Sequence, residues 1–414
     1  MDRSGQTANL LPKEKVDAIV VGSGAAGSAM AARLAEGGKK VVLLEGGPMR
    51  TAGDLVSSAL YARRLKWSGS PVTEEGKDPV GYVFNAAFGV GGAAMHHYAV
   101  WPRLHPEDFD MRARYGRGLD WPVQYADLAP YYDRVQTEVG VAGDAAKETW
   151  RPQGAFAVET PRLLLASANN AHPQGLGNST GLVGRYITTH TAGLVYGMFD
   201  EETEPHRGAF GGQLLNQDSY KKTTHAAQGA FGSYQWMIAQ AVRPNDLLGI
   251  ATTQADLFGA PLLDFMQRAA HGFGGMTAVV EDLPQPQNQV TLQAAKDRYG
   301  VPLAKVVHDS HPESVALWRA SLVEGKAVLH AAGAHEVWTG PPGRMHIMGG
   351  TIMGRTRADS VTNSFGQLHD IPNLVVAGPG LFPTSGGVNP TFTVHALAAR
   401  SAERMLTHWR AIAA

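Results

Sequence analysis

The chain of 414 residues contains no cysteine, which excludes disulfides, thiolate metal sites and cysteine-ligated iron–sulfur clusters. It also lacks a surplus of either charge, because 36 Lys and Arg face 37 Asp and Glu. A basic surface for nucleic acid or anionic lipid is therefore not expected. No apolar run approaches the ~20 residues of a membrane-spanning helix, and residues 1–15 lack the apolar core of a secretory signal. We expect a cytoplasmic protein with a small-molecule partner and no direct membrane span.

Glycine, in contrast, is abundant, and its 49 residues fall in clusters without a collagen-like period. The first cluster lies in residues 16–45, VDAIVVGSGAAGSAMAARLAEGGKKVVLLE. An apolar run at 18–21 meets the glycines, a helical pattern follows, and a second apolar run at 41–44 closes the segment. This order predicts a βαβ unit of the kind that binds dinucleotides.

Each position of this fingerprint has a physical role. Gly22 permits the tight turn, Gly24 lets backbone approach a pyrophosphate, and Gly27 lets the helix pack on the strand. Ala26 lies in the same turn, where the helix amino terminus offers free N–H groups to phosphates. Glu45 follows Gly22 at about the distance expected of a carboxylate that binds an adenosine ribose. The pattern leaves FAD and NAD open.

Three further segments carry helical spacing of apolar residues. Residues 120–141 predict a short amphipathic helix with Asp127 as the cap. Residues 159–169, ETPRLLLASAN, predict a helix entered through Pro161. Residues 313–332 predict a third helix. The expected buried face of this third helix consists of Val315, Trp318, Leu322 and Val323.

The middle of the chain differs in composition from its two ends. Residues 192–292 are rich in aromatic and β-branched segments bounded by turn residues, which predicts a largely antiparallel sheet. The end of the chain, NLVVAGPGLFPTSGGVNPTFTVHALAARSAERML, predicts a strand, a loop, and a helix beginning near Thr391. We therefore expect an α/β fold: a Rossmann-type domain built from residues 1–190 and 341–414, and an α+β substrate domain in residues 191–340.

Four blocks together resemble the glucose–methanol–choline (GMC) family of FAD oxidoreductases. They are the fingerprint ending at Glu45, GVGGAAMHH at 89–97, ETPRLLLASAN, and HIMGGTIMG at 346–354 followed by the terminal block. Within the family, GGTIMGRTRADSV and YGRGLDWPVQYADLAPYY are similar to the large subunits of bacterial glucose, fructose and gluconate dehydrogenases. The resemblance implies FAD as the cofactor and an enzyme that oxidises CH–OH groups.

The resemblance also assigns roles to residues. It implies that His346 is the base that takes the hydroxyl proton while the hydride passes to flavin N5, and that Asn389 hydrogen-bonds the same oxygen. An imidazole, with an unperturbed pKa of ~6.5, suits that task. The alternatives are a core histidine at 346 and a turn residue at 389. No metal site is expected. The cofactor contacts implied by the resemblance are Gly91, Gly92, Ala93, His96, Gly378, Asn389, Pro390 and Thr391.

Three other histidines carry weaker expectations. In pyranose oxidases a histidine at the place of His96 is bonded to the flavin methyl, whereas sugar dehydrogenases carry a similar histidine without that bond. Both states of His96 remain open. We expect His97 and His190 to be packing or hydrogen-bonding residues.

The resemblance breaks in the connection at residues 143–158. Relatives carry a long segment there, which holds strands of the FAD domain and, in the dehydrogenases, the cysteines of an iron–sulfur cluster. Electrons must therefore leave this flavin by another route. The adenine side of the cofactor site is expected to be rebuilt, left open or supplied by a partner.

Three functions fit the sequence. The first is FAD-dependent oxidation of a sugar or polyol hydroxyl, with electrons passed to a non-oxygen acceptor such as a quinone, a cytochrome or a dye. The second is an oxidase that produces hydrogen peroxide from the same substrates, and the third is a non-catalytic flavoprotein subunit. A small or cytochrome subunit is an expected partner, and a partner that bears a signal would place the protein in the periplasm.

Overall fold

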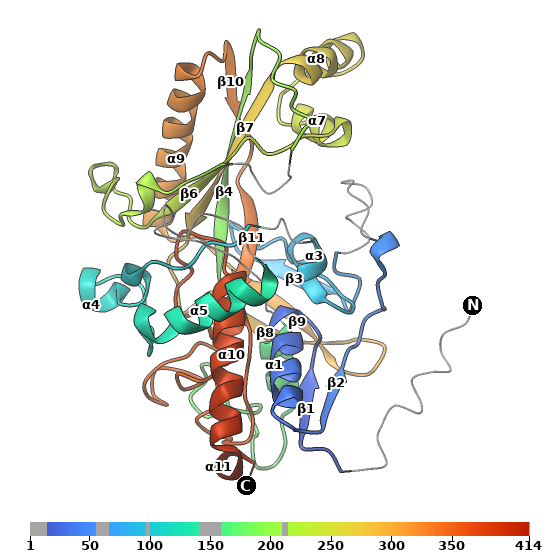
Figure 1. The fold of residues 1–414 in the computed structure, drawn as a ribbon, viewed down its shortest axis with the longest axis vertical. Helices are drawn as coiled ribbons and strands as arrows, with labels where there is room; N and C mark the ends of the chain where they lie inside the picture. Colours follow the sequence, from blue (N-terminus) through green and yellow to red (C-terminus); the bar gives the residue numbers. More distant parts are fainter. Residues whose placement is uncertain (1–14, 55–65, 97–99, 141–158, 209–213, 414) are drawn as a thin grey trace.

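The computed structural model describes residues 15–54, 66–96, 100–140, 159–208 and 214–413. Figure 1 shows two unequal regions, with a long twisted sheet and its helices above, and two parallel-running helices beside a small sheet below. The mixed α/β architecture with an antiparallel second sheet, predicted from the sequence, is confirmed. Among the described helices, none is long and apolar enough to cross a membrane.

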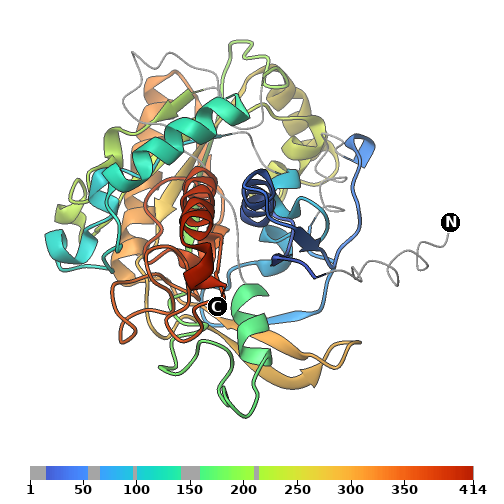
Figure 2. The same ribbon diagram turned by 60° about the horizontal axis from the view of Figure 1, so that its bottom comes forward.

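The βαβ unit forms where the sequence predicts it. Strand β1 (Ala18–Val21) leads through the glycine turn into helix α1 (Ala25–Glu36), and β2 (Val41–Leu44) pairs with β1 in parallel. Helix α10 (Thr391–Thr407) begins at the predicted residue and lies beside α1, as Figure 2 shows. Their contact buries apolar side chains from both ends of the chain in one shared hydrophobic cluster.

The β1–β2 sheet is thinly covered. Within the described residues it has two strands, and Ile19 and Val21 are 63% and 65% exposed. The strand predicted at the start of the terminal block NLVVAGPG is wrong, since Val375 makes only an isolated bridge with Gln367. Its side chain packs against the cluster between α1 and α10. Apolar composition suited this segment to burial, but a strand also needs a hydrogen-bonded neighbour.

The large sheet is antiparallel and buried. Its strands follow the spatial order β10, β4, β7, β6, β5, with β11 pairing the other half of β4. These strands are β4 (Thr188–Met198), β5 (Leu214–Asn216), β6 (Tyr234–Ile238), β7 (Phe273–Glu281), β10 (Glu336–Thr339) and β11 (Gly343–Met348). Helices α7 (Pro244–Ala251) and α8 (Ala260–His271) pack at the end of β7 remote from α10 (Figure 1).

Helix α9 (Pro312–Ala331) covers this sheet with part of the predicted face, since Trp318 and Leu322 pack against the apolar cluster of the sheet. Val323, expected to be buried, is 72% exposed. The buried face is formed by Ser314, Leu317, Ser321, Gly325 and Leu329. A Cβ atom on Gly325 would lie 2.6 Å from the Trp236 ring, so the helix approaches the sheet through small residues, which a hydrophobic pattern does not reveal.

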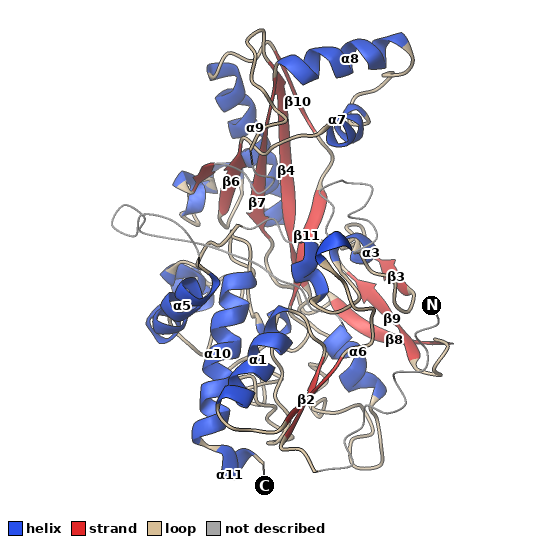
Figure 3. Ribbon diagram, turned by 45° about the vertical axis from the view of Figure 1, so that its right-hand side comes forward, coloured by secondary structure: helices blue, strands red, loops and turns tan. Residues whose placement is uncertain are grey.

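A third sheet and several short helices complete the described fold (Figure 3). The sheet contains β3 (Val72–Glu75), β9 (Pro302–Val307) and β8 (Gln289–Lys296). The remaining helices are α3 (Tyr82–Asn85), α4 (Met111–Tyr115), α5 (Tyr125–Val139), α6 (Glu159–Ala166) and α11 (Trp409–Ile412).

The two helices predicted at 120–141 and 159–169 are confirmed as α5 and α6, but the predicted cap of α5 is corrected. Gln124 is the capping residue, and Asp127 lies three positions later, where its carboxylate accepts from the Gln124 N–H at 2.8 Å. The connection at 143–158 lies outside the described residues.

Candidate active site

The predicted base His346 lies in a β-bulge. On β11 the register shifts between the pairs Met345–His190 and Met348–Thr188, so His346 and Ile347 together oppose Thr189. The backbone of His346 adopts φ +58°, a left-handed conformation that a residue with a Cβ atom rarely takes. Bulges re-aim side chains, and strained backbone of this kind clusters at active sites.

The bulge brings three polar side chains together. His346 is 9% exposed, and its Nδ1 lies 2.8 Å from Nδ1 of His190. Its Nε2 lies 3.2 Å from Nδ2 of Asn389. The two residues predicted to form the catalytic pair are therefore in contact. His190 was expected only to pack or to hydrogen-bond, and it proves to be the partner that holds the other side of the imidazole.

The hydrogen bonds of His190 fix the proton positions in both rings. Nε2 of His190 lies 2.8 Å from the Gly386 carbonyl, which can only accept, so this nitrogen carries a hydrogen. Burial lowers the pKa of His190 to about 4, so the ring is neutral near pH 7 and its Nδ1 is an acceptor. His346 must then donate through Nδ1, which leaves the lone pair on its Nε2.

A second set of contacts leads to the same assignment. Oδ1 of Asn389 accepts from Nε2 of Gln235 at 2.8 Å, so the amide group of Asn389 faces His346 as a donor. Gln235 in turn accepts from Nε2 of Gln217 at 3.1 Å, and Oε1 of Gln217 lies 3.2 Å from Nε2 of His105. With the amide groups oriented in this way, the contacts on both sides of the imidazole leave Nε2 of His346 unprotonated, as a base needs.

The predicted cofactor turn has the expected geometry. Gly22 has φ +92°, and no described atom lies within 4 Å of a Cβ built on Gly22 or Gly24. A Cβ on Gly27 would instead lie 2.0 Å from the Gly22 carbonyl oxygen. The first two glycines thus border open space where a pyrophosphate would approach, and the third permits close packing of helix on strand.

Three distant segments meet at this turn. A Cβ on Gly92 would lie 3.0 Å from Cα of Gly24, and a Cβ on Gly378 would lie 3.7 Å from Cβ of Ala26. The Gly91 N–H donates to Oγ of Ser23 at 3.3 Å. The structure therefore brings together the glycine fingerprint, the second glycine cluster and the carboxy-terminal loop.

Glu45 already holds the fingerprint backbone. One carboxylate oxygen accepts from the N–H and Oγ of Ser23 at 2.9 and 2.8 Å, and the other accepts from the Gly47 N–H at 2.8 Å. An ionised carboxylate has about four acceptor positions, so capacity remains for a ribose hydroxyl.

Other predicted cofactor residues occupy two helix starts. Ala93 and the backbone of His96 lie in a short 3₁₀ helix (Gly92–His96), while the His96 side chain and all of His97 lie outside the described residues. Pro390 is the residue before α10, and Thr391 is its first residue. The covalent state of His96 stays open.

The residues at the α10 end fit a flavin. Thr391 is 2% exposed, and its Oγ1 has no hydrogen-bond partner within the described part of the chain. A buried hydroxyl rarely stays unpaired, and α10 is 17 residues long with free N–H groups at this end. Acceptor atoms such as those on the flavin pyrimidine edge would satisfy both the Thr391 hydroxyl and the N–H groups at the start of α10.

The comparisons with known proteins agree with this geometry. A family model described as GMC oxidoreductase matches residues 284–398, and one described as FAD binding domain matches residues 17–62. The chain belongs to the GMC oxidoreductase family. Its cofactor is FAD, and it is a GMC-type oxidoreductase.

Two relatives match over nearly their whole length. The chain is 26% identical to the 2-methyl-1,2-propanediol dehydrogenase of Mycolicibacterium austroafricanum, covering 94% of this chain and 95% of the relative. It is 25% identical to the fructose dehydrogenase large subunit of Gluconobacter japonicus, covering 94% and 97%. In fold, it resembles pyridoxine 4-oxidase from Mesorbium loti with a TM-score of 0.63 and 15% identity, covering 95% of this chain and all of that one.

The alignments also reveal the internal loss. The match to the propanediol dehydrogenase extends over 535 positions, although this GMC protein has only 414 residues. Long stretches of the relative therefore have no counterpart here.

Sequence reasoning missed several residues of this site. Gln235 and Gln217 were not singled out, and Gly386 was one glycine among many. Gln235 lies on a strand whose alternation indicated only a buried sheet. Their roles depend on contacts across more than 150 positions of sequence, as between Gln235 and Asn389, which no local pattern encodes.

Proposed function

We propose that this GMC protein oxidises a hydroxyl group of a sugar or related polyol, with His346 as the base, and passes the electrons to an acceptor other than oxygen. The observation that carries the proposal is the protonation pattern around His346. Two independent sets of hydrogen bonds leave Nε2 of this buried imidazole as an acceptor beside the donor Asn389.

The residues of the chain would divide the work as follows. FAD, when bound, supplies the hydride acceptor. Nε2 of His346 takes the hydroxyl proton of the substrate, and the resulting imidazolium keeps its Nδ1–H bond to His190. Asn389 has a second amide hydrogen that can be donated to the substrate oxygen. The bulge holds the imidazole in place, so little reorganisation is needed.

The substrate class is proposed from the relatives. Their names include dehydrogenases of a diol, of fructose and, for 32% of this chain at 35% identity, of gluconate in Pantoea cypripedii. The names that contain "large subunit" and "flavoprotein" also support a partner subunit that receives electrons. A quinone, a cytochrome or a dye would serve as the final acceptor.

The test is anaerobic reduction of the purified, FAD-loaded protein by a panel of sugars, polyols and simple alcohols. Bleaching of the flavin absorbance by sugars or polyols, but not by simple alcohols, would support the substrate class. Reoxidation of the reduced flavin by a quinone or dye much faster than by air would support a dehydrogenase. Rapid reoxidation by air would instead identify an oxidase, and a protein that takes up no FAD would overturn the proposal.

A further inference from the structure

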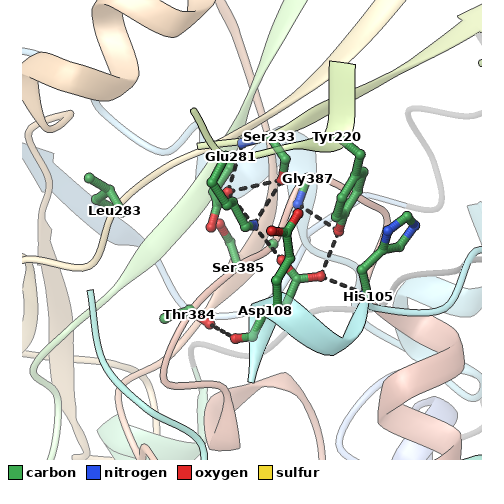
Figure 4. A network of polar contacts seen from close by, with 12 residues as sticks. His105, Asp108, Tyr220, Ser233, Glu281, Leu283, Thr384, Ser385 and Gly387 are labelled. Carbon is green, nitrogen blue, oxygen red and sulfur yellow. Dashed lines mark hydrogen bonds and ion pairs between the residues drawn. The ribbon is translucent and has the colours of Figure 1, made fainter. Parts of the chain in front are cut away.

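A buried charged cluster lies close to the loop that carries Gly387, as Figure 4 shows for Asp108 and Glu281. Lys222 forms ion pairs with Asp108 and with Glu281, the latter at 2.7 Å, and all three side chains are at most 1% exposed. Lys222 also donates to Oγ of Ser233 at 2.9 Å. Burial of three charges is costly unless each is paired, so a cluster of this kind calls for a role.

Tyr220 connects this cluster to the active-site loop. Its hydroxyl donates to Oδ2 of Asp108 at 2.7 Å and accepts from the Gly387 N–H at 3.2 Å. The His105 N–H donates to the same carboxylate oxygen at 2.7 Å, and the His105 ring stacks on Tyr220 with centroids 3.7 Å apart. Tyr220 thus contacts the loop that carries Gly386 and Asn389.

The Gly386–Gly387 peptide group is held from both sides. Its carbonyl accepts from Nε2 of His190 at 2.8 Å, and its N–H donates to Tyr220. The two ends of a trans peptide point in opposite directions. Because neither residue has a Cβ atom, this peptide can rotate more easily than most.

Rotation of this peptide would reverse the protons in the active site. An N–H group would then face Nε2 of His190, which would have to accept and would carry its hydrogen on Nδ1. His346 would have to accept at Nδ1 and carry its hydrogen on Nε2. A ring protonated at Nε2 cannot take a proton there.

We propose that Tyr220 is a positioning residue that locks the Gly386–Gly387 peptide, and that this peptide decides which nitrogen of His346 is the base. The effect of Tyr220 on catalysis rests on the proposed function, whereas the proton positions on His190 and His346 do not depend on it. The series runs from Lys222 through Asp108, Tyr220, the peptide and His190 to His346, and every link has one donor direction.

The charged cluster fixes that direction. Burial lowers the pKa of Lys222, but the charges of Asp108 and Glu281 outweigh this and raise it above the usual value, so Lys222 stays protonated beside Asp108. Burial, and then the charge of Asp108, raise the pKa of the Tyr220 hydroxyl well above its usual value. Tyr220 therefore stays protonated and donates its hydroxyl hydrogen in the hydrogen bond to Asp108. Toward the Gly387 N–H, the hydroxyl oxygen can then only accept.

The test compares Tyr220→Phe with the full-length wild type by nitrogen-15 NMR of histidine-labelled protein near pH 7. The signals of His346 are identified by their loss in His346→Asn. In the wild type, we expect the proton of His346 on Nδ1. In Tyr220→Phe, we expect a major population with the proton on Nε2, since the hydrogen bond that holds the peptide is gone.

Tyr132→Phe is the matched control. Tyr132 is also buried, and its hydroxyl lies 2.6 Å from Oγ1 of Thr393, outside the series that ends at His346. This variant should keep the wild-type proton positions.

Two results would overturn the proposal: a wild-type His346 with its proton on Nε2, or unchanged proton positions in Tyr220→Phe. Flavin bleaching by substrate gives the second readout. We expect Tyr220→Phe to bleach ~10- to 100-fold more slowly than Tyr132→Phe with an unchanged flavin spectrum. A wild type that no alcohol bleaches would defeat the proposed function but leave the NMR result standing.

Discussion

The six-stranded sheet of this GMC protein and its two-stranded β1–β2 sheet differ in how completely they are covered. In β7, Val279 and Val280 are fully buried between neighbouring strands and helices, whereas in β1 Ile19 and Val21 are about two thirds exposed. The buried sheet carries the bulge that places His346, and the exposed one carries the fingerprint turn. His346 is therefore held by a well-covered sheet, while the fingerprint turn follows a strand that is largely exposed within the described residues.

The largest expected effect concerns the buried sheet, which carries His346. We expect His346→Ala to keep the flavin spectrum and to slow anaerobic bleaching by substrate about 100- to 10,000-fold, because a general base contributes on that order. The control is His330→Ala, at an exposed position in the last turn of α9. Equal bleaching rates for the two variants would show that proton removal does not depend on His346.

The buried sheet should also make the free energy of unfolding depend on pH, through His190 on β4. Burial lowers the pKa of His190 to about 4 from 6.5, so the unfolded chain binds a proton between those values that the folded chain does not. The free energy of unfolding should therefore fall by about 3 kcal/mol as the pH drops from ~6.5 to ~4. Urea unfolding at several pH values measures this slope, and His190→Asn should lose that part of it.

The cofactor side can be tested at Gly27. An added Cβ would collide with the Gly22 carbonyl, so we expect Gly27→Ala to distort the turn and weaken FAD binding roughly 10- to 100-fold. Quenching of flavin fluorescence on titration measures the affinity. Gly249→Ala, in α7 with no described atom near the added Cβ, should bind FAD like the wild type. Equal FAD affinities of Gly27→Ala and Gly249→Ala would show that the fingerprint turn does not bind the cofactor.

A matched pair of Val→Ala substitutions compares the two sheets most directly, although the expected change in stability is the smallest of these effects. We expect Val280→Ala in β7 to lower the free energy of unfolding by about 2 kcal/mol, and Val21→Ala in β1 to lower it by no more than about 0.5 kcal/mol. Urea unfolding of both variants decides the matter. Equal losses would mean that the exposed face of β1 is covered in solution.

Local patterns predicted much of this fold, while the active site depends on long-range contacts. The βαβ unit, α5, α6 and α10 follow from apolar spacing and glycine turns, which act over a few residues. The failed strand at the start of the terminal block and the exposed Val323 on α9 show the limit, because contacts outside the local pattern decide both. The pairing of His346 with Asn389 was predicted only through family resemblance. The bulge, His190 as partner and the Tyr220 lock had no sequence signal, since each is created by pairing across strands and loops.

The left-handed backbone of His346 has a consequence for protein engineering. A non-glycine residue in this conformation costs about 1 kcal/mol or more, and glycine would relieve it. Searches for heat-resistant variants that reward relaxed backbone would therefore select replacements at position 346. Such variants would gain thermal tolerance while losing the base, so screens on this protein need to score turnover together with melting temperature.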